Sequence, residues 1–184
     1  MKAATTPSPS QQTQEPALGV DANTAHVMNL EIERKWIIDA LPNISGLQRV
    51  QINQGYLVID KNGDEVRLRQ KGDSLVQTVK KGSGLTRTEI ETTLTQQQFD
   101  ILWPATAGKR IEKTRFQIPH GDVMIEMDVY GGSLRGLIVA EAEFSSIEAA
   151  ESFIPPEWFR EEITHDKSFK NQSLARYGNP WSAK

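Results

Sequence analysis

Short segments in which apolar and polar residues alternate run along most of this chain. A period of two is typical of β-strands that bury one face and leave the other polar. Eight segments are long enough to form strands. They cover residues 28–38, 50–59, 64–71, 74–80, 86–93, 110–118, 122–130 and 137–144.

Polar turn residues separate several of these segments. Asn62-Gly63 and His120-Gly121 are hairpin signals, and Gly82-Ser83-Gly84 indicates a looser turn. Strands joined in this way pair with their neighbours in antiparallel fashion. The pattern therefore predicts an antiparallel sheet built largely from hairpins.

Three stretches with helical features lie between or after the strands. Two begin with a capping-box pair and end at a proline, and the third ends at a glycine. They lie at residues 95–104, 145–155 and 168–178, with Thr95/Gln98 and Ser145/Glu148 as the capping pairs.

The apolar stripes of the first two helices need a surface to cover, and the apolar face of the sheet provides one. We therefore expect an α+β fold, an eight-stranded antiparallel closed β-barrel with a few covering helices. The domain is predicted to span residues 27–178. Residues 1–26 are rich in Thr, Ser, Gln, Pro and Ala, so we expect a disordered extension there.

Composition excludes several classes of function. The chain has 184 residues, enough for one domain, and a net charge of -3, which argues against a general nucleic-acid binder. It has no cysteine, so disulfides and thiolate metal sites are excluded. No apolar run approaches the roughly 18 residues that span a bilayer. The N-terminus has no apolar stretch typical of a secretory signal. We expect a cytoplasmic protein with no membrane partner.

Ionisable residues gather on one face of the predicted strands. Residues i and i+2 share a face, so Glu31, Glu33 and Lys35 lie together, opposite Ile32 and Trp36. A solvated face would explain any single group of this kind. Seven segments behave alike, however, and their charged faces contain both signs at high density. The other groups are Arg67/Arg69, Lys80, Arg87/Glu89/Glu91, Lys113/Arg115, Glu126/Asp128 and Glu141/Glu143.

A barrel with these faces turned inward would hold many cations and carboxylates in one lumen. Buried charges are costly unless they are paired, hydrated or bound to a ligand. A polyphosphate with divalent cations needs both sets of groups: Arg and Lys contact phosphate oxygens, and carboxylates bind hard cations such as Mg²⁺. The chemistry predicted from the charge pattern is phosphoryl transfer to water.

The charged strand motifs resemble those of a known family. Glu31-Ile32-Glu33-Arg34-Lys35 reads as the Glu-x-Glu-x-Lys signature of the triphosphate tunnel metalloenzymes, also called the CYTH superfamily. Further matching motifs follow in family order, and residues 163–171 resemble its closing motif. Other motifs resemble the small bacterial members that are inorganic triphosphatases: Gln54-Gly55-Tyr56-Leu57, Leu102-Trp103-Pro104-Ala105-Thr106 and Ile154-Pro155-Pro156.

The resemblance implies a fold, a cofactor and a reaction. The fold is an eight-stranded antiparallel tunnel, and the cofactor is one or two ions of Mg²⁺ or possibly Mn²⁺. The reaction is hydrolysis of inorganic triphosphate to diphosphate and phosphate.

The resemblance also assigns roles to particular residues. Glu31, Glu33 and Glu143 match metal-binding carboxylates, with Glu141 and Asp128 as helpers. Lys113 and Tyr56 match a catalytic pair, although Glu89 or Glu91 could instead accept the proton of the attacking water. The phosphate chain is expected to bind Lys35, Arg67, Arg69, Lys80, Arg87, Arg115 and Lys167.

Several alternatives remain open from the sequence. The same tunnel could act on thiamine triphosphate, a nucleoside triphosphate or an RNA 5′ end, could cyclise ATP, or could be a silent polyphosphate sensor. Either a monomer or a homodimer is compatible with the sequence. His26, His120 and His165 lack a ligand spacing, so we expect no metal role for them.

Overall fold

The computed structural model describes residues 32–81 and 88–181. All eight predicted strands are present in one sheet with the order β1-β8-β7-β6-β2-β3-β4-β5, and every neighbouring pair is antiparallel. The predicted extension (1–26) and the turn Gly82–Gly84 lie outside the described residues. The strands are β1 Ile32–Ile37, β2 Arg49–Ile59, β3 Glu65–Lys71, β4 Ser74–Lys81, β5 Thr88–Thr93, β6 Arg110–His120, β7 Val123–Tyr130 and β8 Ile138–Phe144.

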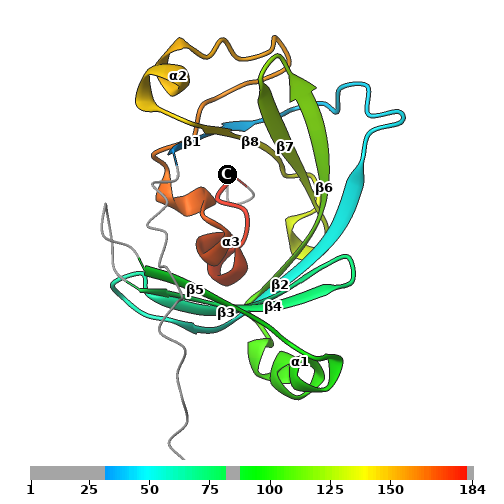
Figure 1. The fold of residues 1–184 in the computed structure, drawn as a ribbon, viewed down its shortest axis with the longest axis vertical. Coiled ribbons are helices and arrows are strands. Elements are labelled where there is room, and N and C mark those ends of the chain that lie inside the picture. The colour runs from blue at the N-terminus through cyan, green and yellow to red at the C-terminus, as the bar shows by residue number, and fades with distance from the viewer. Residues whose placement is uncertain (1–31, 82–87, 182–184) are drawn as a thin grey trace, which may run out of the picture.

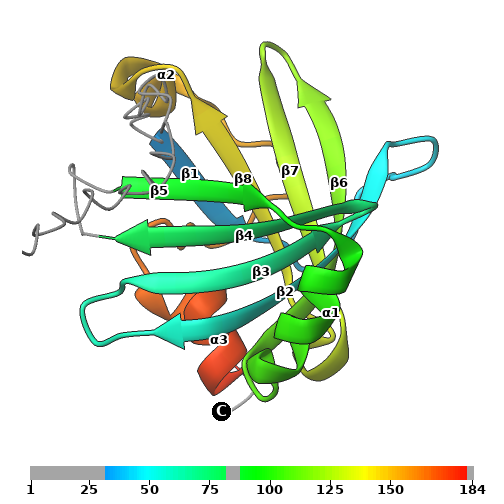
Figure 2. The same cartoon turned by 60° about the horizontal axis from the view of Figure 1, so that its bottom comes forward.

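The sheet curves strongly, but β1 and β5 remain its two edges (Figures 1 and 2). The prediction of a closed barrel is therefore wrong for the part of the chain that the structure describes. The outer edge of β1 bonds instead to a returning C-terminal segment. Arg160 N donates to Ile37 O at 2.9 Å, Ile37 N donates to Glu161 O at 2.9 Å, and Ile163 N donates to Lys35 O at 2.8 Å. Alternation fixes which face of a strand is buried, but it does not fix which backbone pairs with an edge.

Within residues 32–81 and 88–181, three α-helices and three short 3-10 helices accompany the sheet. Thr95 caps the first helix with the predicted capping box, whereas the second is capped by Ser146 rather than Ser145. None of the described helices is long and apolar enough to cross a membrane. The elements are α1 Gln96–Leu102, η1 Trp103–Thr106, η2 Gly132–Leu134, α2 Ile147–Ser152, η3 Lys167–Phe169 and α3 Asn171–Tyr177.

The first two helices cover the outer face of the sheet, as predicted (Figure 1). Phe99 of α1 belongs to one buried cluster with Leu68 and Leu75. Ala150 of α2 belongs to a second cluster, which includes Trp36 and Phe144. These contacts bury the apolar side of the alternating strands, so the opposite side faces the interior of the curve.

Helix α3 lies inside the curve of the sheet rather than outside it (Figure 1). Leu174 of α3 and Phe169 of η3 pack with Ile37, Tyr130 and Val139, which come from three strands. One end of the inner face is therefore apolar and filled. On the same strands, two and four residues further along, the inner face becomes charged.

Candidate active site

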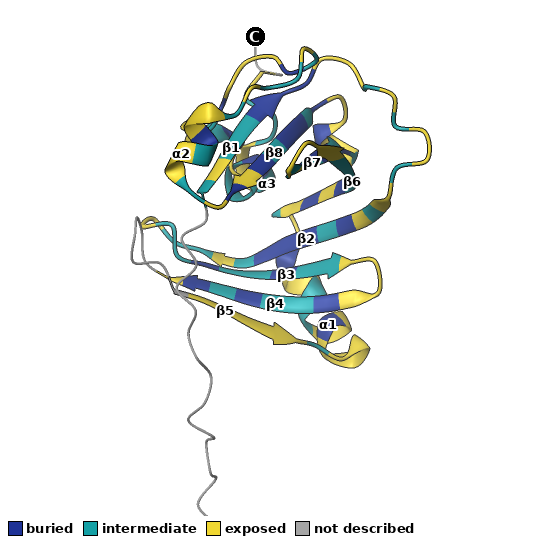
Figure 3. Ribbon diagram, turned by 45° about the horizontal axis from the view of Figure 1, so that its top comes forward, coloured by how far each residue is buried: buried dark blue, intermediate teal, exposed yellow. Residues whose placement is uncertain are grey.

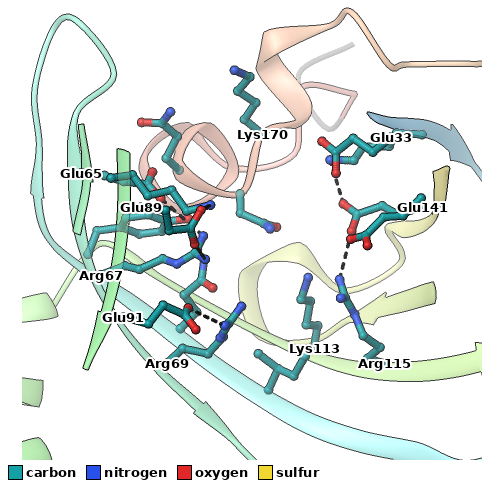
Figure 4. Close-up of a pocket in the computed structure, with 18 residues that line it drawn as sticks. Glu33, Glu65, Arg67, Arg69, Glu89, Glu91, Lys113, Arg115, Glu141 and Lys170 are labelled. Atoms are coloured by element: carbon teal, nitrogen blue, oxygen red, sulfur yellow. Dashed lines mark hydrogen bonds and ion pairs between the residues drawn. The ribbon is translucent and has the colours of Figure 1, made fainter. Parts of the chain in front are cut away.

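The charged part of the inner face surrounds a cavity of about 360 Å³, which α3 borders at its N-terminal end (Figure 4). It gathers ten of the predicted site residues, including Tyr56, Lys113 and the carboxylates Glu33, Glu141 and Glu143. Glu31 and Arg87 lie outside the described residues. Lys167 is exposed on η3, and it is not part of the cavity lining. The lining residues are Glu33, Lys35, Ile52, Gln54, Tyr56, Glu65, Arg67, Arg69, Lys80, Glu89, Glu91, Lys113, Arg115, Glu141, Glu143, Lys170, Asn171 and Gln172.

One side of the cavity consists of a connected set of charges on β1, β6, β7 and β8, which we call the network wall (Lys35, Lys113, Arg115, Asp128 and Glu141). Arg115 donates to Asp128 through Nε at 2.7 Å and through Nη2 at 2.6 Å. Nη2 of Arg115 also reaches Glu141 at 3.0 Å. The second oxygen of Glu141 pairs with Lys35 Nζ at 2.7 Å. Each carboxylate of the wall thus bridges two cations.

The network wall shifts the pKa values of its members. Burial alone would raise the pKa of Glu141, but Lys35, Lys113 and Arg115 outweigh that effect and hold it at about 2. Burial opposes the charge of Lys35 too, yet Glu141 and Glu33 leave its pKa raised. Both groups therefore stay charged, because each is paired with an opposite charge.

Asp128 is the most enclosed member of this wall. Its side chain is 0% exposed, and its oxygens bond to Arg115 and Lys113. It is not among the cavity-lining residues. This placement does not favour the expected helper role in metal binding; Asp128 instead anchors the two cations in front of it.

Lys113 and Tyr56, the predicted catalytic pair, both line the cavity, but each bonds to a different partner. The ammonium of Lys113 donates to Asp128, and the hydroxyl of Tyr56 accepts a hydrogen bond from Gln54 Nε2 at 2.6 Å. Burial, with Arg115 adding to it, lowers the pKa of Lys113. Burial is a larger cause of this shift than the neighbouring cation.

The other side of the cavity is formed by β3, β4 and β5, and we call it the paired wall (Arg67, Arg69, Lys80, Glu89 and Glu91). Arg69 pairs with Glu91 at 3.1 Å, and Lys80 pairs with Glu89 at 2.6 Å. Arg67 reaches Glu89 only at 3.6 Å. Its Nε is buried and has no hydrogen-bond partner in the described structure. A buried donor of this kind calls for an acceptor, and a phosphate oxygen is one.

The carboxylates where β1 and β8 border the cavity fit a hard divalent cation. Glu33 and Glu143 lie directly opposite each other in the β1–β8 register. Two like charges in this position repel, and a cation between them would relieve the repulsion. Among the described residues no group of three such side chains forms a complete metal site. Glu31, the third predicted ligand, lies outside them.

Several lining residues were not predicted as site residues. Gln54 and Glu65 each lie two positions before a predicted residue, Tyr56 and Arg67, so the alternation of the strands could have revealed them. Three more come from the start of α3 and the residue before it: Lys170, Asn171 and Gln172. No periodicity in the sequence places a terminal helix inside a curved sheet, so only the closing motif pointed to this region.

Comparisons with known proteins agree with this geometry. No family model matches the sequence. An inorganic triphosphatase of Nitrosomonas europaea is 46% identical over 147 residues, which cover 79% of this chain and 96% of that protein. An inorganic triphosphatase of Acetivibrio thermocellus is 32% identical over 156 residues, covering 84% of this chain and 97% of that protein. The crystal structure of the inorganic triphosphatase NE1496 aligns with a TM-score of 0.66 at 43% identity, covering 81% of this chain and 96% of that one.

Both relatives are matched over nearly their whole length, and the aligned structure shares the fold. This chain therefore belongs to the inorganic triphosphatase family, within the triphosphate tunnel metalloenzymes that its strand motifs resemble.

Proposed function

We propose that this protein hydrolyses inorganic triphosphate to diphosphate and phosphate with the help of Mg²⁺ or Mn²⁺. The observation that carries the proposal is the cavity lining, in which seven cationic side chains and six carboxylates of the described residues face one space. A polyanion needs the cations, and a divalent metal needs the carboxylates. The names of both relatives support triphosphate as the substrate.

The cations would bind and orient the phosphate chain. Arg67, Arg69 and Lys80 reach the cavity from the paired wall, and Lys35 and Arg115 reach it from the network wall. Fixed cations on two sides can align the terminal phosphorus for attack by water and stabilise charge on the departing diphosphate. The water oxygen bonds to the terminal phosphorus as the phosphoanhydride bond breaks, the departing diphosphate keeps the electron pair of that bond, and a cavity-lining group such as Lys113, Glu89 or Glu91 accepts the proton of the water.

The carboxylates at the mouth of β1 and β8 would hold the metal. Glu33, Glu143 and Glu141 are the described candidates, with Glu31 as the further predicted ligand. A divalent ion bound there would supply charge neutralisation and a more acidic water. Because Glu141 is already bonded to Lys35 and Arg115, it would also fix the position of these cations relative to the metal.

The decisive experiment measures phosphate release from inorganic triphosphate, ATP and thiamine triphosphate, each with Mg²⁺, Mn²⁺ or EDTA. We expect fast release from inorganic triphosphate with metal, much slower release from the other two, and none with EDTA. Glu33→Ala should abolish the activity, whereas Glu151→Ala, at an exposed position on α2, should leave it unchanged. Turnover of none of the three substrates, despite tight binding of triphosphate, would replace this proposal with that of a polyphosphate sensor.

A further inference from the structure

Tyr56 and Gln54 form a buried hydrogen-bonded pair in the wall of the cavity. They lie two residues apart on β2, so their side chains share the inner face. Tyr56 is 1% exposed and Gln54 is 2% exposed, yet both line the cavity. The amide nitrogen of Gln54 donates to the hydroxyl oxygen of Tyr56 at 2.6 Å.

This bond restricts the direction of the hydroxyl proton. A phenol has one proton to donate and oxygen lone pairs that accept. Since Gln54 donates to the oxygen, the proton of the hydroxyl must point elsewhere. In the described part of the chain, no hydrogen bond has the Tyr56 hydroxyl as its donor. The donor is thus held in the cavity wall without an acceptor among residues 32–81 and 88–181.

The hydroxyl is also kept in its neutral, proton-carrying form. Burial raises the pKa of Tyr56 well above its ordinary value, and the nearby carboxylate of Glu65 raises it further. Arg67 and Gln54 oppose this shift without cancelling it. A neutral phenol can donate a hydrogen bond, but it is a poor proton acceptor. Lys113, which bonds to Asp128, makes no described hydrogen bond to Tyr56.

We propose that Gln54 is a positioning residue that directs the hydroxyl proton of Tyr56 toward a phosphate oxygen of the bound triphosphate. Phosphate oxygens of this ligand are acceptors, so a neutral hydroxyl donor in the wall complements them. Tyr56 then acts as a neutral hydrogen-bond donor beside Arg67, not as a base. The inference rests on the proposed function, because it takes triphosphate as the ligand.

A double-mutant cycle tests whether Gln54 works through the hydroxyl. The variants are Gln54→Met, Tyr56→Phe and the combination of both, compared by kcat/KM for inorganic triphosphate. We expect each single change to lower kcat/KM by about tenfold to a hundredfold, the size of a lost hydrogen bond to a charged group. Adding Gln54→Met to Tyr56→Phe should cause little further loss. Independent, multiplying losses, or full activity of Gln54→Met, would overturn the proposal.

Two further measurements separate this role from a merely structural one. Gln51→Met is the matched control, because Gln51 lies on the same strand, is exposed, and accepts a hydrogen bond from Thr114 at 2.9 Å outside the cavity. It should leave kcat/KM unchanged. The same cycle is then measured as binding of inorganic triphosphate in EDTA, where no turnover is expected.

The two assays fail in different ways. Coupled losses in binding, with no turnover by the unmodified protein, would overturn the proposed function and keep the role of Gln54. Turnover by the unmodified protein, with independent losses in both assays, would keep the proposed function and overturn the role of Gln54. A protein that neither binds nor hydrolyses triphosphate would overturn both.

Discussion

On the network wall the charged side chains bond to one another in a connected set, whereas on the paired wall most cations face carboxylates of β5. Asp128 is 0% exposed and Glu141 is 12% exposed, but Glu89 is 29% exposed and Glu91 is 46% exposed. Figure 3 shows the same contrast in the strands, with buried residues along β7 and β8 and exposed residues along β5. The carboxylates of the two walls thus lie at different depths, whereas the side chains of Lys80 (8% exposed) and Arg67 (11%) are as enclosed as that of Arg115 (13%).

The difference in depth implies different tasks. A buried network of carboxylates that each bridge two cations is costly to break, because any removed partner leaves an uncompensated buried charge. Exposed ion pairs are weak and screened by salt, so a phosphate group can replace their carboxylates. We infer that the network wall fixes the geometry of the site, while the paired wall exchanges its internal partners for substrate.

The largest expected effect is the loss of stability on breaking the network wall. Asp128→Asn keeps the shape of the side chain but removes the charge that holds Lys113 and Arg115. We expect the free energy of unfolding to fall by about 3–5 kcal/mol, as for other broken buried ion pairs. Urea denaturation measures this. Glu126→Gln is the matched control on the same strand, since Glu126 is 22% exposed and pairs with Arg115. Equal losses for the two variants would show that depth does not distinguish these charges.

The next largest loss of stability is expected on β2, the strand that joins the two walls. A Cβ atom at Gly55 of β2 would lie 2.5 Å from Thr106 Oγ1. Thr106 is held in place, because it donates to Trp103 O at 2.7 Å and accepts from Arg110 Nε at 2.7 Å. Gly55→Ala should therefore cost about 1–3 kcal/mol of unfolding free energy, as overpacking does.

The control for this change is Gly131→Ala. Its added Cβ would lie 3.2 Å from Cγ of Glu112, a flexible side chain that can move. Thermal or urea denaturation should show a clearly smaller loss than for Gly55→Ala. If the two glycines tolerate alanine equally, β2 is not pinned against η1, and movement of this strand would be expected to disturb Gln54 and Tyr56.

The sequence predicted the strands and the faces of their side chains well, since alternation is a local property. The groups Arg67/Arg69, Lys113/Arg115 and Glu141/Glu143 all contribute to the inner charged face. The sequence did not predict backbone pairing between segments that lie far apart along the chain. The backbone at the edge of β1 forms hydrogen bonds with residues 160–163, and the sequence pattern of that segment does not predict this pairing.

The depth of each charge was equally hidden from the sequence. Asp128 and Glu143 are each the second carboxylate of an i, i+2 pair on neighbouring strands, yet Asp128 is fully buried and Glu143 is exposed. The difference arises from distance to the apolar end of the inner face, where Tyr130 and Val139 pack against α3. That distance depends on tertiary packing. The metal-binding role expected for Asp128 was inferred from its motif alone, which does not report how deeply the side chain is buried.

A moderate effect is expected for substrate binding on the paired wall. Arg69→Met removes a guanidinium whose partner is the exposed Glu91, so the unfolding free energy should change by less than about 1 kcal/mol. KM for inorganic triphosphate should rise about tenfold or more, because a charged hydrogen bond to phosphate is lost. Lys71→Met is the control, since Lys71 is exposed on the same strand and does not line the cavity. Steady-state kinetics and urea denaturation of both variants test the two expectations.

The smallest effect concerns the carboxylate that the substrate would displace. Glu91 accepts from Arg69 Nη2 at 3.1 Å and from Thr78 Oγ1 at 2.9 Å. Glu91→Gln keeps an acceptor for Thr78 but removes the charge that competes with phosphate for Arg69. Inorganic triphosphate should then bind about two- to fivefold more tightly, the scale of one exposed ion pair. Calorimetric titration in EDTA measures this, with Glu151→Gln as a control away from the cavity. Weaker binding would mean that Glu91 holds Arg69 in the conformation that receives phosphate, and the paired wall would then be a fixed scaffold like the network wall.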